Sequence, residues 1–345
     1  MPRVSDLVQD SKLETHFSPE YTVHIYNESS RTSREQTRVA QREEYWKRER
    51  EIGGGSYGRV WLEQCVGGQR EIVLRAVKQI AKPSFLSKPV DYNRELEAIS
   101  KFSHWKYERC FVKSFGWYES PEAVFIAMEY CEHGDLHTYL VYSPPLPEVE
   151  AQQVTFQVLE GLSFMHDNGF SHRDIKPGNI LVASKPPDNW WVKLGDFGIS
   201  KRTDAGLGFA STVKGTIRFM APELLGFFDA GDDTDPRNEQ AADIWALGEI
   251  AFQMLTKEAT FEPVHRLGAY VRNHVFPVGS LQARGISDDA IRFESLLDEA
   301  SGVYKFESSD FCTNETAFIA HGIITAAREC YSAISQVDNR VKTAP

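Results

Sequence analysis

Two short segments carry side chains that could bind a metal ion and move a proton. Asp174 and Asn179 lie in SHRDIKPGN, and Asp196 lies further along the chain in GDFG. Carboxylate and amide oxygens are the ligands that Mg²⁺ prefers, and Mg²⁺ usually has few protein ligands together with substrate phosphates. Asn179 and Asp196 therefore suit a Mg²⁺ site, and Asp174 is left to accept a proton from an attacking hydroxyl.

Lys176 lies between Asp174 and Asn179 and could neutralise charge that builds up on a transferred group. The alternative is that each segment is a polar turn that caps a strand. That alternative is credible for either segment alone. It is disfavoured for both together, in this order, with Lys78 and Glu95 upstream.

The segment IGGGSYGRV contains the pattern G-x-G-x-x-G at Gly53, Gly55 and Gly58. A dinucleotide-binding glycine loop is preceded by a strand and followed by a helix, whereas the residues after Gly58, RVWLEQCV, are typical of a second strand. The glycines therefore predict a hairpin turn that could fold over phosphates with its backbone exposed. From these residues alone, a plain flexible turn stays open as the alternative.

Lys78 ends the strand-like run RAVK and could offer a point charge to phosphate oxygens beside this hairpin. A lone Lys at a strand end is more often solvated. Glu95 lies in the helical segment DYNRELEAISKF and could pair with Lys78, which would fix the ammonium in one place.

The surrounding sequence predicts the elements that position these residues. Between residues 45 and 130, β-branched and aromatic runs are separated by turn residues, and one helix interrupts them. Beyond residue 131, PEVEAQQVTFQVLEGLSFMHDNG predicts a long amphipathic helix, and AADIWALGEIAFQMLT predicts a buried helix that is apolar nearly all round. We expect an α+β fold, with a smaller β-rich lobe and a larger, mostly helical lobe joined near 129–134.

Two polar segments are interpreted without a function. Residues 1–44 are polar, and the charge-crowded residues 31–51 favour a solvated approach to the first strand over a helix or a docking arm. The acidic segment 229–240 lacks the alternating oxygen ligands and terminal Glu of an EF-hand, so we interpret it as a solvated insertion.

The composition excludes several classes of protein. The net charge of −11 over 345 residues argues against non-specific binding to nucleic acid or to an anionic membrane surface. The five cysteines form no C-x-x-C pair, so neither a disulfide framework nor a zinc site is expected. The sequence contains no signal-peptide pattern and no apolar run of membrane-spanning length. We therefore expect a reducing compartment, the cytoplasm or the nucleus.

The motifs GGGSYGRV, AVK, HRDIKPGN, DFG and APE follow one another in this order. With them the chain resembles a eukaryotic protein kinase of the Ser/Thr type from about residue 46 to its end. The resemblance implies a bilobal fold with an N-lobe at 45–130, a C-lobe at 131–345 and an activation segment at 196–223. Residues 1–44 are an extension outside the resemblance.

The same resemblance implies ATP and Mg²⁺ as cofactors and assigns the site residues. The catalytic residues that it implies are the base Asp174, the γ-phosphate contact Lys176, and the phosphate contact Lys78 with its partner Glu95. The metal ligands that it implies are Asn179 and Asp196. The residues that it places around the nucleotide are Ile52, Gly53, Gly55, Gly58, Val60, Ala76, Lys78, Met128, Glu129, Cys131, Asp135 and Leu181.

The resemblance also implies regulatory and structural residues. Arg173 would receive a phosphate from the activation loop, and we expect Thr212 to carry it, added by an upstream kinase or by self-phosphorylation. Asp243 resembles the residue that holds the catalytic loop, and Glu223 is expected to pair with Arg340.

The leading hypothesis is an active Ser/Thr kinase that acts on protein hydroxyl groups, because Lys176 in DIKPGN and Thr216 in GTIRFMAPE match that class rather than Tyr kinases. A catalytically silent pseudokinase, acting as an ATP-binding or scaffolding module, would be favoured by loss of Lys78, Asp174 or Asp196, and all three are present. A kinase of small molecules is disfavoured, because GTIRFMAPE resembles a peptide-binding feature.

Overall fold

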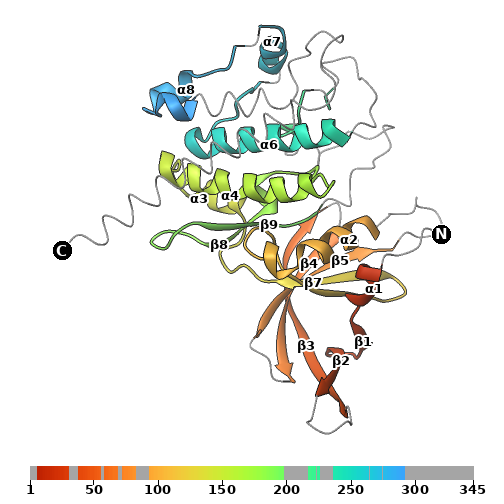
Figure 1. Cartoon of the computed structure of the whole chain (residues 1–345). Coiled ribbons are helices and arrows are strands. Elements are labelled where there is room, and N and C mark those ends of the chain that lie inside the picture. The colour runs from red at the N-terminus through yellow and green to blue at the C-terminus, as the bar shows by residue number, and fades with distance from the viewer. Residues whose placement is uncertain are drawn as a thin grey trace. The chain divides into compact units, whose positions relative to one another are not determined.

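The computed structural model describes ten stretches of the chain. They are residues 6–30, 38–55, 58–68, 72–82, 93–197, 217–222, 224–225, 236–263, 265–273 and 275–291. The chain divides into two compact units, with the boundary between Glu132 and His133. We call them the N-terminal unit and the C-terminal unit and describe each by itself (Figure 1).

The N-terminal unit is built on a seven-stranded antiparallel sheet with the strand order β1-β2-β3-β4-β5-β7-β6. Its strands are β1 (Glu14–Phe17), β2 (Thr22–Ser30), β3 (Arg38–Gly55), β4 (Gly58–Gly67), β5 (Leu74–Ala81), β6 (Ser114–Glu119) and β7 (Ala123–Glu129). Its helices are α1 (Asp6–Asp10), α2 (Asn93–Phe102) and the 3₁₀ turn η1 (Trp105–Tyr107). The predicted β-rich character of this region and its one main helix are confirmed.

The hairpin predicted from the glycine-rich segment is confirmed. Gly53 faces Val60 and Gly55 faces Gly58 in the antiparallel pairing of β3 with β4. Gly58 has φ +132°, and a Cβ there would lie 2.1 Å from the carbonyl oxygen of Gln79. Only glycine fits that close approach of β4 to β5.

The expected solvated approach over residues 31–51 is wrong for residues 38–51, which lie in β3. The strand alternates as a half-buried strand should, with Glu44 and Trp46 buried and their neighbours exposed. The alternation typical of a strand is hard to detect in the sequence, because Glu44 occupies an inward position with a charged side chain. Glu44 accepts hydrogen bonds from Arg42 Nη1 (2.5 Å) and Trp46 Nε1 (3.1 Å), so its burial is compensated.

The sheet curves back toward itself, because β1 and β6, at opposite ends of the strand order, contact each other. Phe17 of β1 lies 5.8 Å, between ring centroids, from Phe125 of β7, and His24 of β2 lies 4.8 Å from Tyr118 of β6. Strands β1 and β2, which precede residue 46, therefore cover one face of β6 and β7.

That covered face holds a buried ion pair. Arg75 donates through Nε (3.0 Å) and Nη2 (2.7 Å) to Glu63 Oε2, and its guanidinium lies 4.0 Å from the centre of the Trp46 ring. Burial, and then the charge of Arg75, lower the pKa of His24 to about 3, so this imidazole is neutral at physiological pH. The Arg75–Glu63 pair is therefore held by two hydrogen bonds and by stacking of the guanidinium on Trp46.

Helix α2 packs through one side, as its periodicity predicts. Leu96, Ile99 and Phe102 are buried, and the Phe102 ring lies 4.7 Å from that of Phe111. Ser103, just after the helix, accepts a hydrogen bond through Oγ from the backbone N–H of Ser114 at 3.0 Å. The C-terminal end of α2 is therefore bonded directly to the start of β6.

The C-terminal unit is mostly helical. Its elements are α3 (Leu136–Tyr142), α4 (Glu148–Asp167), η2 (Pro177–Asn179), β8 (Ile180–Ser184), β9 (Trp191–Leu194), α6 (Pro236–Thr256), α7 (His265–Asn273) and α8 (Gly279–Ala283). Helix α4 lies beside α6 and packs on β9 (Figure 1). The side chains of α4 that were expected on one face are all buried: Val154, Val158, Leu159, Leu162 and Met165.

Helix α6 is buried nearly all round from residue 241, as its composition predicts. Of the insertion expected over 229–240, residues 236–240 form the start of α6 rather than a turn, and residues 229–235 lie outside the described residues. Proline is well suited to the first turn of a helix, since its missing N–H would have no partner there. No described helix has the length and apolarity required to cross a bilayer.

Candidate active site

The predicted nucleotide contacts of the N-terminal unit share one face of the sheet. Val60 is directly opposite Lys78, and Ala76 is directly opposite Met128. Directly opposed residues of antiparallel strands point to the same face, as do residues two apart in one strand. Gly53, opposite Val60, belongs to this face as well. The opposite face of the sheet, which carries Val77 and Phe125, is the face that β1 and β2 cover.

Lys78 is buried, with 7% of its surface exposed, and β5 continues beyond it to Ala81. The strand therefore does not end at Lys78, and the usual solvated lysine at a strand end does not apply. Glu95 lies in α2, but its side chain is outside the described residues, so its pairing with Lys78 stays a prediction.

The remaining predicted contacts of this unit lie at strand ends. Ile52 and Gly55 are in β3, where Gly55 pairs with Gly58 of β4. Glu129 is the last residue of β7, and its backbone N–H donates to the carbonyl oxygen of Lys113 (2.9 Å). Cys131 follows β7 and is partly buried.

The loop between α4 and β8 is held by one buried carboxylate from α6. Asp243 accepts hydrogen bonds from the backbone N–H groups of His172 (2.8 Å) and Arg173 (2.7 Å), and His166 Nε2 lies 2.9 Å from its Oδ2. Arg173 has φ 66°, a conformation that costs free energy for a non-glycine residue. The bonds to Asp243 stabilise that conformation and fix the backbone that carries Asp174.

The carboxylate of Asp174 is 6% exposed and is held by two side chains that the sequence placed beside it. Lys176 Nζ donates to Asp174 Oδ2 at 2.7 Å. Asn179 Nδ2 donates to the same oxygen at 3.1 Å and to the backbone oxygen of Asp174 at 2.7 Å. The three residues predicted from SHRDIKPGN therefore form one hydrogen-bonded group.

Two bonds connect this loop to the segment that carries Asp196. The backbone N–H of Gly195 donates to the Asn179 carbonyl oxygen (2.9 Å), and His172 Nε2 lies 3.0 Å from the Gly195 carbonyl oxygen. The register of the β8–β9 hairpin, with Ile180 opposite Leu194, brings the two segments together. Asp196 has φ 57°, so its backbone, like that of Arg173, is in the left-handed region.

The donor set fits a magnesium ion. Because Asn179 is bonded through Nδ2, its amide presents the Oδ1 oxygen as the ligand end. Asp196 adds a carboxylate next to Gly195, which is bonded to Asn179. Two oxygen ligands are enough for Mg²⁺ when substrate phosphates supply the remaining ligands.

Asp135 and Leu181 lie together in this unit as an isolated bridge pair. Asp135 Oδ1 accepts from the backbone N–H of Thr138 (2.7 Å), so Asp135 caps α3. The sequence reasoning missed this cap and the role of His172, although the histidine stands in the same motif as Asp174. The predicted residues Thr212, Thr216, Glu223 and Arg340 lie outside the described residues.

Comparison with known proteins agrees with this geometry. The Ser/Thr-protein kinase RAD53 of Saccharomyces cerevisiae is 31% identical over 230 residues, which cover 64% of this chain and 27% of RAD53. The calcium/calmodulin-dependent protein kinase type 1 of Caenorhabditis briggsae is 33% identical over 204 residues, 59% of this chain and 52% of that protein. This chain thus spans about a quarter to a half of the length of these relatives.

Among solved structures, the crystal structure of Rad53 1–466 in complex with AMP-PNP matches 81% of this chain and 79% of its own chain, with a TM-score of 0.57 and 21% identity. This likeness shows the bilobal α+β fold. The model of the protein kinase domain matches residues 46–290. Since that match covers well over half of the sequence, the chain belongs to the protein kinase family.

Proposed function

We propose that the chain is an active Ser/Thr protein kinase that transfers the γ-phosphoryl group of Mg-ATP to serine and threonine hydroxyls of proteins. One observation carries the proposal: the buried carboxylate of Asp174 is held by Lys176 and Asn179 in a loop fixed by Asp243. The curated relatives named as Ser/Thr-protein kinases support the choice of hydroxyl.

In this proposal each residue of the C-terminal unit has one task. Asp174 orients the substrate hydroxyl and receives its proton. Lys176, bonded to Asp174, also contacts the group in transfer and offsets its negative charge. Asn179 and Asp196 hold Mg²⁺, which when bound supplies positive charge to the phosphate oxygens.

The residues of the N-terminal unit bind the nucleotide. Val60, Ala76 and Met128 share a face with Lys78 and would contact the base, while Lys78 would contact phosphates. Several more nucleotide contacts stay as proposed from the resemblance: Ile52, Gly53, Gly55, Gly58, Glu129, Cys131, Asp135 and Leu181. The AMP-PNP in the crystal structure of Rad53 supports a nucleotide of this class.

Activation by phosphorylation of Thr212, read by Arg173, is part of the proposal, whether an upstream kinase or the protein itself adds the phosphate. We place the protein in the cytoplasm or the nucleus. The cysteine spacing, which contains no C-x-x-C pair, supports a reducing compartment.

A pseudokinase is the contrasting function, and it is not favoured, because Lys78, Asp174 and Asp196 are all retained. The test is a radiolabel assay with ATP, Mg²⁺ and a degenerate peptide library. Asp174→Asn should reduce turnover by about 10²–10⁴-fold, because it removes the proton acceptor. Exposed Asp188→Asn is the matched control and should leave turnover unchanged. Equal turnover in Asp174→Asn and wild type would refute the assigned base, and ATP binding without transfer by wild type would favour the pseudokinase.

A further inference from the structure

The residues before β1 are bonded to the edge strand β6. Leu13 donates its backbone N–H to the Trp117 carbonyl oxygen (2.7 Å), and the Trp117 N–H donates to the carbonyl oxygen of Ser11 (3.1 Å). The Trp117 indole Nε1 donates to the carbonyl oxygen of Val8 (2.7 Å). We call residues 6–13 the N-terminal segment. Its backbone is bonded to β6 at three points.

The same segment contacts α2. Helix α1 lies beside α2 (Figure 1), with Val8 only 1% exposed. Ser11 Oγ lies 2.8 Å from Ser100 Oγ of α2 and donates to the Val8 carbonyl oxygen at 3.0 Å. One short stretch of chain therefore joins the helix to the edge strand.

Because Ser103 also bonds Ser114, three elements form a closed set of contacts. Helix α2 is bonded to β6, β6 is bonded to the N-terminal segment, and the segment is bonded back to α2. The position of α2 over the sheet is therefore set from two sides rather than one.

Gly116 makes the close approach of the segment possible. It has φ +121°, and a Cβ there would lie 2.6 Å from the Ser11 carbonyl oxygen and 2.9 Å from the Leu13 side chain. A Cβ at position 116 would therefore displace residues 11–13, because the Ser11 carbonyl oxygen belongs to the backbone and cannot rotate away as a side chain can. A glycine at this position of an edge strand is otherwise a weakness.

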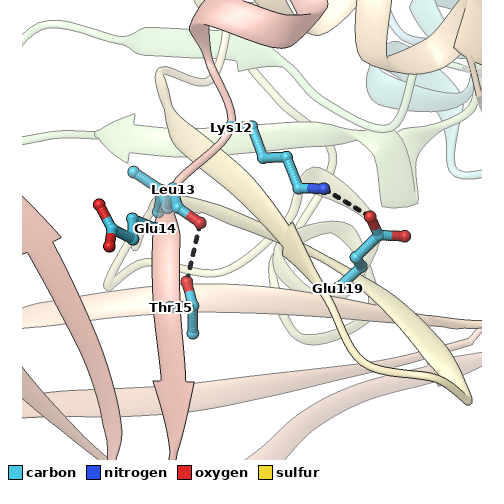
Figure 2. Close-up of a pocket in the computed structure, with 5 residues that line it drawn as sticks. All are labelled: Lys12, Leu13, Glu14, Thr15 and Glu119. Carbon is cyan, nitrogen blue, oxygen red and sulfur yellow. Dashed lines mark hydrogen bonds and ion pairs between the residues drawn. The ribbon is translucent and has the colours of Figure 1, made fainter.

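Figure 2 shows the ion pair that ends the segment, beside a hollow lined by Lys12, Leu13, Glu14, Thr15 and Glu119. Lys12 Nζ lies 2.5 Å from Glu119 Oε1, and Lys82 Nζ, just after β5, lies 2.6 Å from Glu119 Oε2. Hydrogen bonds from Lys12, and then Lys82, hold the pKa of Glu119 below its ordinary value. Lys12, Glu119 and Lys82 are partly exposed, so their ion pairs orient the N-terminal segment more than they stabilise the fold.

We propose that the N-terminal segment positions α2, and with it Glu95, for phosphoryl transfer, so that Val8, Ser11 and Leu13 are positioning residues. The inference rests on the proposed kinase function and on the expected pairing of Glu95 with Lys78. Glu95 and Ser100 lie on the same helix, so a displacement of the helix at Ser100 is transmitted to Glu95. Residues 6–13, which lie outside the family match, then contribute to catalysis by positioning α2.

The test uses the full chain with Gly116→Ala, which displaces residues 11–13. Amide hydrogen exchange across residues 93–102 should become faster, and kcat should fall at least about tenfold, because small misplacements of positioning groups cost that much or more. The KM for peptide should stay within about twofold, because GTIRFMAPE, the expected peptide-binding segment, belongs to the C-terminal unit and the N-terminal segment does not. Gly285→Ala is the control: it also has positive φ (+69°), but its Cβ would have no heavy atom within 4 Å.

Milder variants keep the test decisive if Gly116→Ala fails to fold. Ser11→Ala and Ser100→Ala should each lower kcat, and the double variant should cost less than the sum, since both remove one hydrogen bond. Trp117→Phe keeps a ring but loses the bond to Val8 and should also lower kcat. Ser11→Thr keeps the hydroxyl, so its kcat should be close to that of wild type rather than to that of Ser11→Ala.

The outcomes separate this inference from the proposed function. An active wild type whose Ser11, Ser100 and Trp117 variants melt earlier but keep their kcat would overturn the inference and leave the kinase function standing. A wild type without transfer activity would refute the kinase function. In that case, unchanged exchange across 93–102 in the variants would overturn the contact with α2 as well, and faster exchange would support it.

Discussion

Among single residues, two buried carboxylates of α6 have opposite surroundings. Asp243 is 1% exposed and accepts from two backbone N–H groups. Glu249 is 2% exposed, and its Oε1 has no hydrogen-bond partner among the residues that the structure describes. The oxygens of Asp243 are therefore used as hydrogen-bond acceptors, whereas burial of Glu249 favours the neutral form of its carboxyl group.

Replacing Asp243 should impair catalysis without removing any group that touches substrate. Asp243→Asn places an amide where the carboxylate accepts from His172 and Arg173, so the strained backbone before Asp174 should relax. We expect kcat to fall roughly 10²-fold, as for other small misplacements of catalytic groups. Steady-state kinetics check this, with exposed Asp167→Asn as the control. A normal kcat would show that the loop keeps its geometry without Asp243.

Glu249 should make stability depend on pH. Burial raises the pKa of Glu249 to about 8 from its ordinary 4.5. Both states are protonated below pH 4.5, and between pH 4.5 and 8 only the unfolded chain releases the proton, so this group lowers stability as pH rises. Glu249→Gln does not titrate and should raise the free energy of unfolding by on the order of 1–3 kcal/mol at about pH 7.5 and by less at about pH 5.

Denaturant unfolding at the two pH values measures this difference, with exposed Glu97→Gln as the control. An equal effect of Glu249→Gln at both pH values would mean that the side chain is ionised in the folded protein.

Among the elements, the β3–β4 hairpin and helix α2 depend on specific close contacts with their neighbours. The hairpin approaches β5 so closely that Gly58 has no room for a Cβ. Helix α2 is held by its apolar side and by hydroxyl contacts at Ser100 and Ser103. These elements carry residues of the proposed nucleotide site but are positioned by contacts outside it.

Gly58→Ala should weaken the N-terminal unit and ATP binding together. The Cβ would displace Gln79, next to Lys78, and the φ of +132° is unfavourable for alanine. We expect a loss of at least about 1 kcal/mol in stability and a higher Kd for ATP. Gly178→Ala, where a Cβ would meet nothing within 4 Å, is the comparison for the steric effect in thermal unfolding. Wild-type stability and ATP affinity in Gly58→Ala would contradict the close approach.

The sequence predicts these elements unequally, for physical reasons. Helices α2, α4 and α6 and strands β4 to β7 follow from apolar periodicity, because their inward positions are apolar. Strands β1 to β3 do not, because inward positions such as His24 and Glu44 are polar and are compensated only by partners elsewhere in the sheet. The contact of Ser11 with Ser100 spans 89 positions of sequence, and no local pattern can indicate it.

The residues of the candidate site were likewise predictable where they are close in sequence and not where they come from distant elements. Asp174, Lys176 and Asn179 are close in sequence, so their grouping is predictable from the motif, and the structure bonds them together. The alternation of β5 likewise places Ala76 and Lys78 on one face. The support from Asp243 was expected from the resemblance alone, because it comes from a distant helix.

For the chain taken as a whole, the proposed function requires that it bind Mg-ATP. Mg-ATP should therefore stabilise the folded chain, by about 2.7 kcal/mol at a concentration of roughly 100 times Kd. Lys78→Met should raise the Kd roughly tenfold or more, because a charge-assisted contact is lost. Isothermal titration and thermal unfolding check both values, with exposed Lys47→Met as the control. No stabilisation by Mg-ATP would remove the basis for a nucleotide site.

The most direct measurement is the transfer of label from γ-³³P-ATP, with Mg²⁺, to a Ser/Thr peptide library, followed by phosphoamino-acid analysis. We expect phosphoserine and phosphothreonine to accumulate with wild type and to fall by at least about 10²-fold with Asp174→Asn. The same yield from both proteins, or no labelled peptide from a wild type that binds Mg-ATP, would contradict the assignment of this chain as an active Ser/Thr kinase.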